Sequence, residues 1–441
     1  MSLGANRLVE IGKGLVSREV FVDREVYDIE QERVFGRCWL YLGHETQIPE
    51  PGDFLTTYMG EDPVILWRDP NGRPRAFLNT CRHRGNRLCL YERGNASAFT
   101  CSYHGWTYNG EGKLTGVPYH VEAYFDELDR DRWGLIQTPR LTSYGGMVFG
   151  SWDPDARSLD EYLGDVRWYL DAVLLVAEDL GGLEPVTSSR YAARGNWKIP
   201  AENFAGDHYH NPTTHGSSYK LGLRAAEFVG PQGRCGPFEV AIAPGHGLGG
   251  LTTGAESFER DLANADRVGP EARYYVEARY AAIKKRVKGA GSVPYSFSHA
   301  NVFPNFAIWG GSALRGHGFF MFHPRGPLST EVRQTVLFPR EAPQVIKEMA
   351  IADLGRGGHF ASGFFEQDDA NNFEQVTQGT TSYIARQYPF YFGMGLGHEG
   401  RWPGQEEWEV HDLPGLIGPR FSEHPQRCFY AFWAELIGEG E

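Results

Sequence analysis

The chain has too few cysteines for a disulfide-stapled fold and no apolar run long enough to cross a membrane. Six cysteines occur in 441 residues, whereas disulfide scaffolds are short and rich in cysteine. No stretch reaches the eighteen or so apolar residues that a membrane span needs. The first twenty residues carry Arg7, Glu10 and Arg18 in place of the apolar core of a secretory signal. We therefore expect a protein of the reducing cytoplasm, whose cysteines are available as metal ligands.

Positive charge is also scarce. The formal net charge is −13, which argues against general nucleic-acid binding, because such binding needs a strongly basic surface. The stretch GHGLGG at 245–250 matches the glycine spacing of a dinucleotide-binding loop, but LTTGAES, which follows it, is a poor opening for a phosphate-binding helix. We expect no nicotinamide or flavin site in this chain.

The composition and texture indicate an α+β protein with more than one domain. With 41% hydrophobic and 22% charged residues, the chain is ordinary for a globular protein with a sizeable core. Residues 20–35 look helical, and short strand-like runs with turn signals such as Asn71-Gly72 follow, which predicts a hairpin there. Ser158 and Glu161 form a capping-box signature at the start of a mixed helix and strand region. We expect an N-terminal segment at 1–38, an all-β domain at 39–155 and a larger α+β domain at 156–441.

Cysteine and histidine alternate in two short segments of the all-β region. Cys81 and His83 are followed, after seventeen residues, by Cys101 and His104. Two thiolates can hold one iron of a [2Fe–2S] cluster while two neutral imidazoles hold the other. A structural zinc uses the same residue types, but zinc modules usually keep the cysteines in one half and the histidines in the other. The surroundings, CRHRG and CSYHGWTYNGEG, resemble the Rieske ferredoxin-like domain closely, so we expect a Rieske cluster.

A second group of possible metal ligands lies in ENFAGDHYHNPTTHG, residues 202–216. Asp207 and His210 are three residues apart, so on a helix their side chains are neighbours. Pro212 can break the helix and let His215 return to the side of His210.

A carboxylate ligand must come from elsewhere, and FFEQDDANNFEQV offers Glu366, Asp368 and Asp369. On a helix, Asp369 shares a face with two phenylalanines, which suits a ligand that looks into an apolar site. Spacing alone does not decide among the three carboxylates. Two histidines and one carboxylate would form the facial triad of non-haem iron oxygenases, with positions open for oxygen and substrate.

Both segments resemble the iron-site motifs of the α subunits of ring-hydroxylating dioxygenases. NWKIPAENFAGDHYH and FFEQDD carry this resemblance, and the similarity runs from GRCWLYLGHE to at least Asn372. It implies an antiparallel sheet with helices, of helix-grip type, as the catalytic domain, with the N-terminal segment packed on it. It also implies that His210, His215 and Asp369 hold a mononuclear iron, that Asn203 lies beside it, and that Asp207 bridges His210 to the Rieske histidine of a neighbouring subunit.

The function implied is that of a terminal oxygenase. Such an enzyme uses O₂ and electrons from NAD(P)H, delivered by a ferredoxin and/or reductase, to cis-dihydroxylate an aromatic ring. The most similar members of the family oxidise naphthalene, biphenyl and larger polycyclic hydrocarbons, and they form α₃ rings, usually α₃β₃ with a small β subunit. The hydrocarbon enzymes often carry small or apolar residues at the positions of His208, Asn211 and His359. These polar side chains make a substituted aromatic acid a second expected class of substrate. The expected pocket residues are Phe204, His208, Asn211, Trp309, His359 and Phe365.

Two alternatives stay open at this stage. A Rieske monooxygenase or demethylase acting on an aromatic compound would need the same two metal sites. An electron-transfer Rieske protein is the alternative from a different class, but a pure electron carrier has no use for a second, open iron site.

Overall fold

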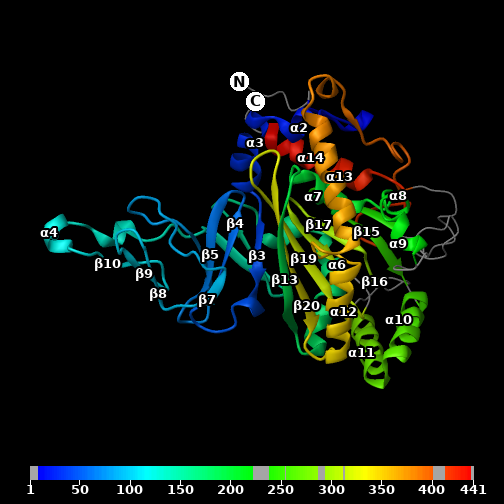
Figure 1. The fold of residues 1–441 in the computed structure, drawn as a ribbon, viewed down its shortest axis with the longest axis horizontal. Helices are drawn as coiled ribbons and strands as arrows, with labels where there is room; N and C mark the ends of the chain where they lie inside the picture. Colours follow the sequence, from blue (N-terminus) through cyan, green and yellow to red (C-terminus); the bar gives the residue numbers. More distant parts are fainter. Residues whose placement is uncertain are drawn as a thin grey trace. The chain divides into compact units, whose positions relative to one another are not determined.

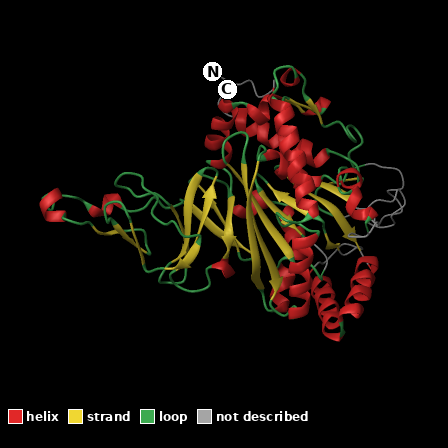
Figure 2. Ribbon diagram, viewed as in Figure 1, coloured by secondary structure: helices red, strands yellow, loops and turns green. Residues whose placement is uncertain are grey.

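The computed structural model describes residues 8–221, 238–253, 255–286, 294–310, 313–400 and 413–438. The chain divides into two compact units. One consists of Phe35–Leu159, and the other combines Met1–Val34 with Asp160–Glu441. The N-terminal segment therefore belongs with the C-terminal unit. Figure 2 shows strands predominating in the smaller unit and a mixture of strands and long helices in the larger one, which confirms the expected α+β class.

The smaller unit is built from short antiparallel strands. A four-stranded sheet has the order β6-β5-β4-β7, and two three-stranded sheets have the orders β10-β9-β8 and β11-β12-β3. The predicted hairpin at Asn71-Gly72 is confirmed, because it joins β5 to β6 and Gly72 takes a positive φ of 76°. The strands are β3 (Leu40–His44), β4 (Asp53–Met59), β5 (Asp62–Arg68), β6 (Pro74–Leu78), β7 (Arg93–Asn95), β8 (Ala98–Thr100), β9 (Thr107–Asn109), β10 (Leu114–Gly116), β11 (Arg140–Tyr144) and β12 (Met147–Ser151), with short helical turns at η3 (Glu45–Gln47), α4 (His120–Tyr124) and η4 (Arg130–Trp133).

The larger unit is organised around one antiparallel sheet of nine strands. Its order is β13-β20-β19-β18-β17-β15-β14-β22, with β16 paired to β15. The central strands β18 and β19 are buried along their whole length, as expected for a sheet with both faces covered. The strands are β13 (Leu183–Ala193), β14 (Phe238–Ile242), β15 (His246–Thr253), β16 (Pro294–Ser296), β17 (His299–Val302), β18 (Phe306–Trp309), β19 (His317–Pro324), β20 (Thr330–Pro339) and β22 (Leu416–Gly418).

Helices from both ends of the chain pack on this unit (Figure 1). α7 packs on β15 and β17, and α13 packs on β13. A small sheet of β1, β2 and β21 ties the N-terminal segment to residues near 390. The elements are β1 (Val9–Glu10), η1 (Ile11–Lys13), β2 (Leu15–Val16), α2 (Glu19–Val22), α3 (Arg24–Glu30), η2 (Gln31–Phe35), α5 (Leu159–Leu163), α6 (Val166–Val173), η5 (Leu175–Leu180), α7 (Lys198–Gly206), α8 (Asn211–Thr214), α9 (Gly216–Lys220), α10 (Ala255–Val268), α11 (Pro270–Arg286), α12 (Gln344–Arg356), α13 (Phe364–Thr381), η7 (Ala385–Gln387), β21 (Phe390–Tyr391) and α14 (His424–Gly438).

A buried carboxylate fixes the start of α7. Glu30, on α3, accepts hydrogen bonds from Lys198 Nζ at 2.5 Å, Trp197 Nε1 at 2.9 Å and Trp433 Nε1 at 2.9 Å. All four side chains are fully buried. Because Trp433 lies on α14, this one carboxylate joins the N-terminal segment, α7 and the C-terminal helix.

The stretch 245–250 runs from the turn after β14 into β15, so it does not open a helix. Within the ranges that the structure describes, no helix has the length and apolar character needed to cross a membrane.

Candidate functional site: two metal centres and a cavity

Two loops of the smaller unit bring the cysteines and histidines of the first motif together. Cys81 and His83 follow β6, and Cys101 and His104 lie between β8 and β9. The rings of His83 and His104 have their centroids 4.6 Å apart. Both cysteines are buried and neither forms a disulfide.

The surroundings of this group fit a [2Fe–2S] cluster. Burial raises the pKa of the Cys81 thiol, and the phenol of Tyr108, with its oxygen 3.5 Å from Cys81 Sγ, lowers it in part. His83 Nδ1 is buried without a hydrogen-bond partner, and its ring stacks on Trp106 at 4.9 Å. Buried polar atoms usually have hydrogen-bond partners, so an unpartnered buried nitrogen beside two free thiols fits the donor set of a metal cluster. These four residues could hold a cluster of two irons.

A tighter ligand group lies in the larger unit. His210, His215 and Asp369 have ligand atoms that all lie within 4.8 Å of one another, and no other group of His, Cys, Asp and Glu in the described residues does so. Asp369 Oδ1 is 3.3 Å from His215 Nε2 and 3.6 Å from His210 Nε2.

The other two carboxylates of FFEQDD face different partners. Asp368 Oδ2 lies 3.4 Å from His215 Nδ1, the nitrogen that points away from Asp369. Glu366 accepts a hydrogen bond from the Tyr191 hydroxyl. The tertiary structure therefore decides among the three candidate carboxylates. Of the three, only Asp369 has an oxygen near both His210 and His215.

The local backbone differs from the expected helix. Asp207 follows the last residue of α7, so Asp207 and His210 do not share a helix, and that prediction was wrong. The chain turns after Gly206, and His210 N donates to Asp207 Oδ1 at 3.2 Å, which keeps the two side chains adjacent. Pro212 stands in the first turn of the short α8 rather than breaking a longer helix.

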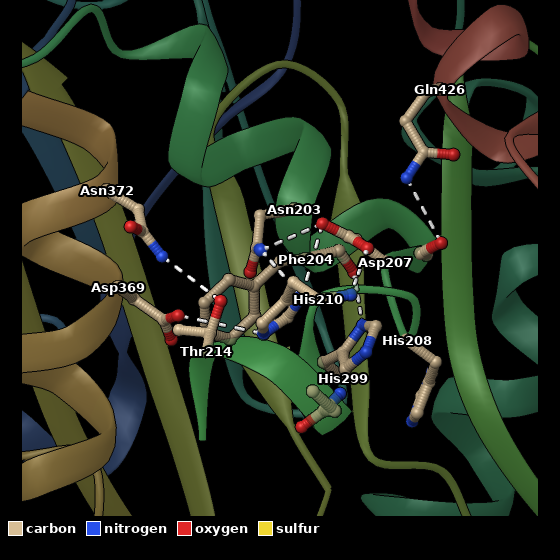
Figure 3. Close-up of polar contacts among 12 residues, drawn as sticks. Asn203, Phe204, Asp207, His208, His210, Thr214, His299, Asp369, Asn372 and Gln426 are labelled. Atoms are coloured by element: carbon tan, nitrogen blue, oxygen red, sulfur yellow. Dashed lines mark hydrogen bonds and ion pairs between the residues drawn. The ribbon is translucent and has the colours of Figure 1, made fainter. Parts of the chain in front are cut away.

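Asp207 and Asn203 hold the face of His210 that is turned away from Asp369 (Figure 3). Asp207 Oδ2 is 3.2 Å from His210 Nδ1, and Asn203 Nδ2 is 3.4 Å from the same carboxylate oxygen. Burial acts to lower the pKa of His210, but the hydrogen bond and charge of Asp207 outweigh it and raise the pKa to about 9. A carboxylate in this position orients a ligating imidazole and raises its basicity.

A cavity of about 550 Å³ opens beside the side chains of His210, His215 and Asp369. Its size suits an arene of two or three rings. Asn203, His210, His215 and Asp369 are part of its wall. The structure places all six expected pocket residues in the wall as well: Phe204, His208, Asn211, Trp309, His359 and Phe365.

The sequence reasoning missed two residues of this wall region. Glu239, on β14, is fully buried and its Oε1 lies 2.9 Å from His208 Nδ1. His299, on β17, stacks on His208 with centroids 4.8 Å apart. Burial lowers the pKa of His208 and raises the pKa of Glu239, so it disfavours the charged form of both groups. No local motif marks either residue, because both reach the site through the pairing of β14, β15 and β17.

Comparison with known families agrees with this geometry. Residues 38–139 match the family model described as Rieske [2Fe-2S] domain. Residues 159–439 match the model described as ring hydroxylating alpha subunit (catalytic domain). The chain belongs to the ring-hydroxylating α-subunit family. As a ring-hydroxylating α subunit it is an oxidoreductase whose cofactors are a Rieske [2Fe–2S] cluster and a mononuclear iron.

Individual relatives of this α subunit are similar over nearly their whole length. The chain is 36% identical to the biphenyl dioxygenase subunit alpha of Paraburkholderia xenovorans (strain LB400), over 98% of this chain and 93% of that protein. It is 35% identical to the large oxygenase component of the naphthalene 1,2-dioxygenase system of Pseudomonas aeruginosa, over 94% and 90%. A solved structure of naphthalene 1,2-dioxygenase with indole bound in the active site matches with a TM-score of 0.83 and 29% identity, covering 100% of this chain and 96% of that one.

Proposed function

We propose that this α subunit is the terminal oxygenase that cis-dihydroxylates an aromatic ring. The observation that carries the proposal is the combination, in one chain, of a Cys₂His₂ loop pair and a His₂Asp group beside a partly open cavity. The balanced reaction takes the arene, O₂, two electrons and two protons to a cis-dihydrodiol. In this proposal, NAD(P)H supplies the electrons through a separate ferredoxin and/or reductase.

Each metal site has its own residues in this proposal. Cys81, His83, Cys101 and His104 hold the cluster, and His210, His215 and Asp369 hold the mononuclear iron. When bound, the cluster supplies one-electron transfer and the iron supplies oxygen activation. Asp207 orients His210 through Nδ1, and Asn203 supports Asp207. The aromatic wall keeps bulk water from the reacting ring, which protects reactive oxygen species from side reactions.

The proposal extends to partners and location. The relatives are named as one subunit or component of larger systems, which supports a ferredoxin and/or reductase as donor and an α₃ or α₃β₃ assembly. In such an assembly, Asp207 would join His210 to His104 of a neighbouring copy. The small number of cysteines supports a cytoplasmic location. The domain limits that go with this function are 39–155 for the Rieske domain and 156–441 for the catalytic domain, on which residues 1–38 pack.

Product analysis tests the proposal. Purified α subunit, with its donor proteins and any β subunit, is incubated with biphenyl, naphthalene and substituted benzoates under ¹⁸O₂. Two labelled oxygens in one cis-diol product are expected. A single labelled oxygen would instead establish a monooxygenase or demethylase, and reduction of the cluster without oxidation of any arene would favour an electron-transfer protein.

A further inference from the structure

One wall of the cavity is more polar than an unsubstituted hydrocarbon requires. His208 is 3% exposed, and within the described residues its side chain hydrogen-bonds only to Glu239, which is itself fully buried. Two glycines of β15 make room for this pair. A Cβ at Gly249 would lie 2.5 Å from Glu239 Oε2, and a Cβ at Gly250 would lie 2.6 Å from His208 Cε1. The backbone and the buried carboxyl group thus fix the orientation of the imidazole.

A second imidazole supports the first. His299 Nδ1 donates to the carbonyl oxygen of Phe204 at 3.0 Å, which fixes its ring. The ring lies nearly parallel to that of His208, at an angle of 22°. His299 Nε2 is buried without a hydrogen-bond partner. Burying polar groups with incomplete hydrogen bonding is unfavourable, and an apolar substrate would offer these groups nothing in return.

We propose that the cavity selects an arene carrying a hydroxyl substituent, whose oxygen pairs with Nε2 of His208. This inference rests on the proposed function and specifies its substrate class. His208 lines the cavity, and its Nδ1 is already engaged by Glu239. A hydroxyl group both donates and accepts a hydrogen bond, so it can pair with either tautomer of the imidazole. Glu239 is a positioning residue, because it acts on the substrate only through His208.

A carboxylate substituent fits this wall less well. It can only accept hydrogen bonds, so it can pair with only one of the two tautomers of the His208 imidazole. The cavity also has three arginines in its wall, Arg260 and Arg267 of α10 and Arg315. Arg267 is exposed and the other two are partly exposed, so water screens their charges. Arg315 also faces the carboxylate of Asp353 at 3.8 Å.

The test compares arenes that differ in one group of nearly equal size. The probes are 1- and 2-naphthol, 1- and 2-methylnaphthalene, and 2-naphthoate, used with the complete enzyme system. The dissociation constants are measured by calorimetry on the iron-loaded protein, and kcat and KM are measured separately. The naphthols should bind about tenfold or more tightly than the methylnaphthalenes, since a site built to hydrogen-bond a hydroxyl rejects the analogue that lacks it.

Three variants assign the preference to its residues. His208→Leu should reduce the naphthol-to-methylnaphthalene binding ratio to near one, and His208→Gln should retain part of it. Glu239→Gln should lower this binding ratio, and in turnover it should change the KM for the naphthols more than kcat. The control is His323→Leu, which removes an imidazole that is just as buried but outside the cavity wall, and it should leave the ratio unchanged. Iron content and the Rieske absorption report whether each variant is folded.

The outcomes separate this inference from the proposed function. Equal binding of naphthols and methylnaphthalenes to the wild type, tighter binding of 2-naphthoate, or a naphthol preference that survives in His208→Leu would each overturn the inference, and the dihydroxylase assignment would stand. If the wild type oxidises no arene with its donors, the proposed function fails, while the calorimetric ratio still decides whether His208 binds a hydroxyl group.

Discussion

Replacing Glu30 by Gln should destabilise the catalytic unit more than any change at its surface. The substitution keeps the volume of the side chain but removes the charge that faces Lys198 Nζ at 2.5 Å. Both side chains are fully buried, and the same carboxylate accepts hydrogen bonds from Trp197 and Trp433. The variant therefore leaves an uncompensated ammonium group in the protein interior and places an amide where two indole N–H groups need acceptors.

Two estimates of the loss agree. Removing one partner of a buried ion pair costs about 3–5 kcal/mol of unfolding free energy. Alternatively, Lys198 gives up its proton: burial acts to lower its pKa and Glu30 opposes this in the wild type. Losing a proton at pH 7 from an unfolded-state pKa of about 10.4 costs about 4.6 kcal/mol. We expect a loss of about 4 kcal/mol.

The second estimate also fixes a pH dependence. In Glu30→Gln the folded state lacks a proton that the unfolded lysine holds, so the variant gains stability as pH rises towards 10. The difference in unfolding free energy between Glu30→Gln and the wild type should shrink by about 1.4 kcal/mol per pH unit between pH 7 and 9.

Urea unfolding of the iron-loaded protein, followed by tryptophan fluorescence, measures these free energies. Adding Lys198→Met to Glu30→Gln should restore most of the stability, because it removes the unpaired charge. The control is Arg24→Ala, which breaks the exposed ion pair with Asp28 and should leave the unfolding midpoint unchanged. A double variant no more stable than Glu30→Gln alone, or a loss below about 1 kcal/mol, would refute the reasoning.

Three further predictions concern the site. Asp369→Ala should lower the affinity for the mononuclear iron more than about a hundredfold while the Rieske absorption stays intact. Asp368→Ala should lower that affinity about 10–100-fold at most, because Asp368 faces the other nitrogen of His215. Metal analysis with visible spectroscopy compares the two variants, and the opposite order of affinities would reassign the iron ligand to Asp368. Asp207→Ala should keep both metals and a reducible cluster but turn over about 10–100-fold more slowly, and single-turnover oxidation of its reduced cluster at the wild-type rate would contradict this. His359→Phe should change product ratios across an arene panel more than iron content, since its ring lies in the cavity wall 5.3 Å from Trp309; unchanged ratios would count against that role.

The sequence alone determined the chemistry that depends on short spacing. Each Cys–His pair lies within one short loop: Cys81 with His83, and Cys101 with His104. The two side chains of a pair are therefore close together whatever the arrangement of the surrounding strands. The same holds for His210 and His215, although the path between them is a turn and a short helix rather than the expected broken helix. Binary patterns and turn residues likewise indicated the α+β class and the hairpin at Asn71-Gly72.

Only the tertiary structure decided which distant groups meet. Glu366, Asp368 and Asp369 are chemically alike and lie within one turn of α13, so the choice among them depends on how that helix is rotated against His215. The pairing of His208 with Glu239 depends on where β14 lies in the sheet, and that of Lys198 with Glu30 on the packing of α3 against α7. These pairs matter because a buried carboxyl group loses its hydrogen bonds to water and needs a partner within the protein. Only the folded chain decides which residue is close enough to be that partner.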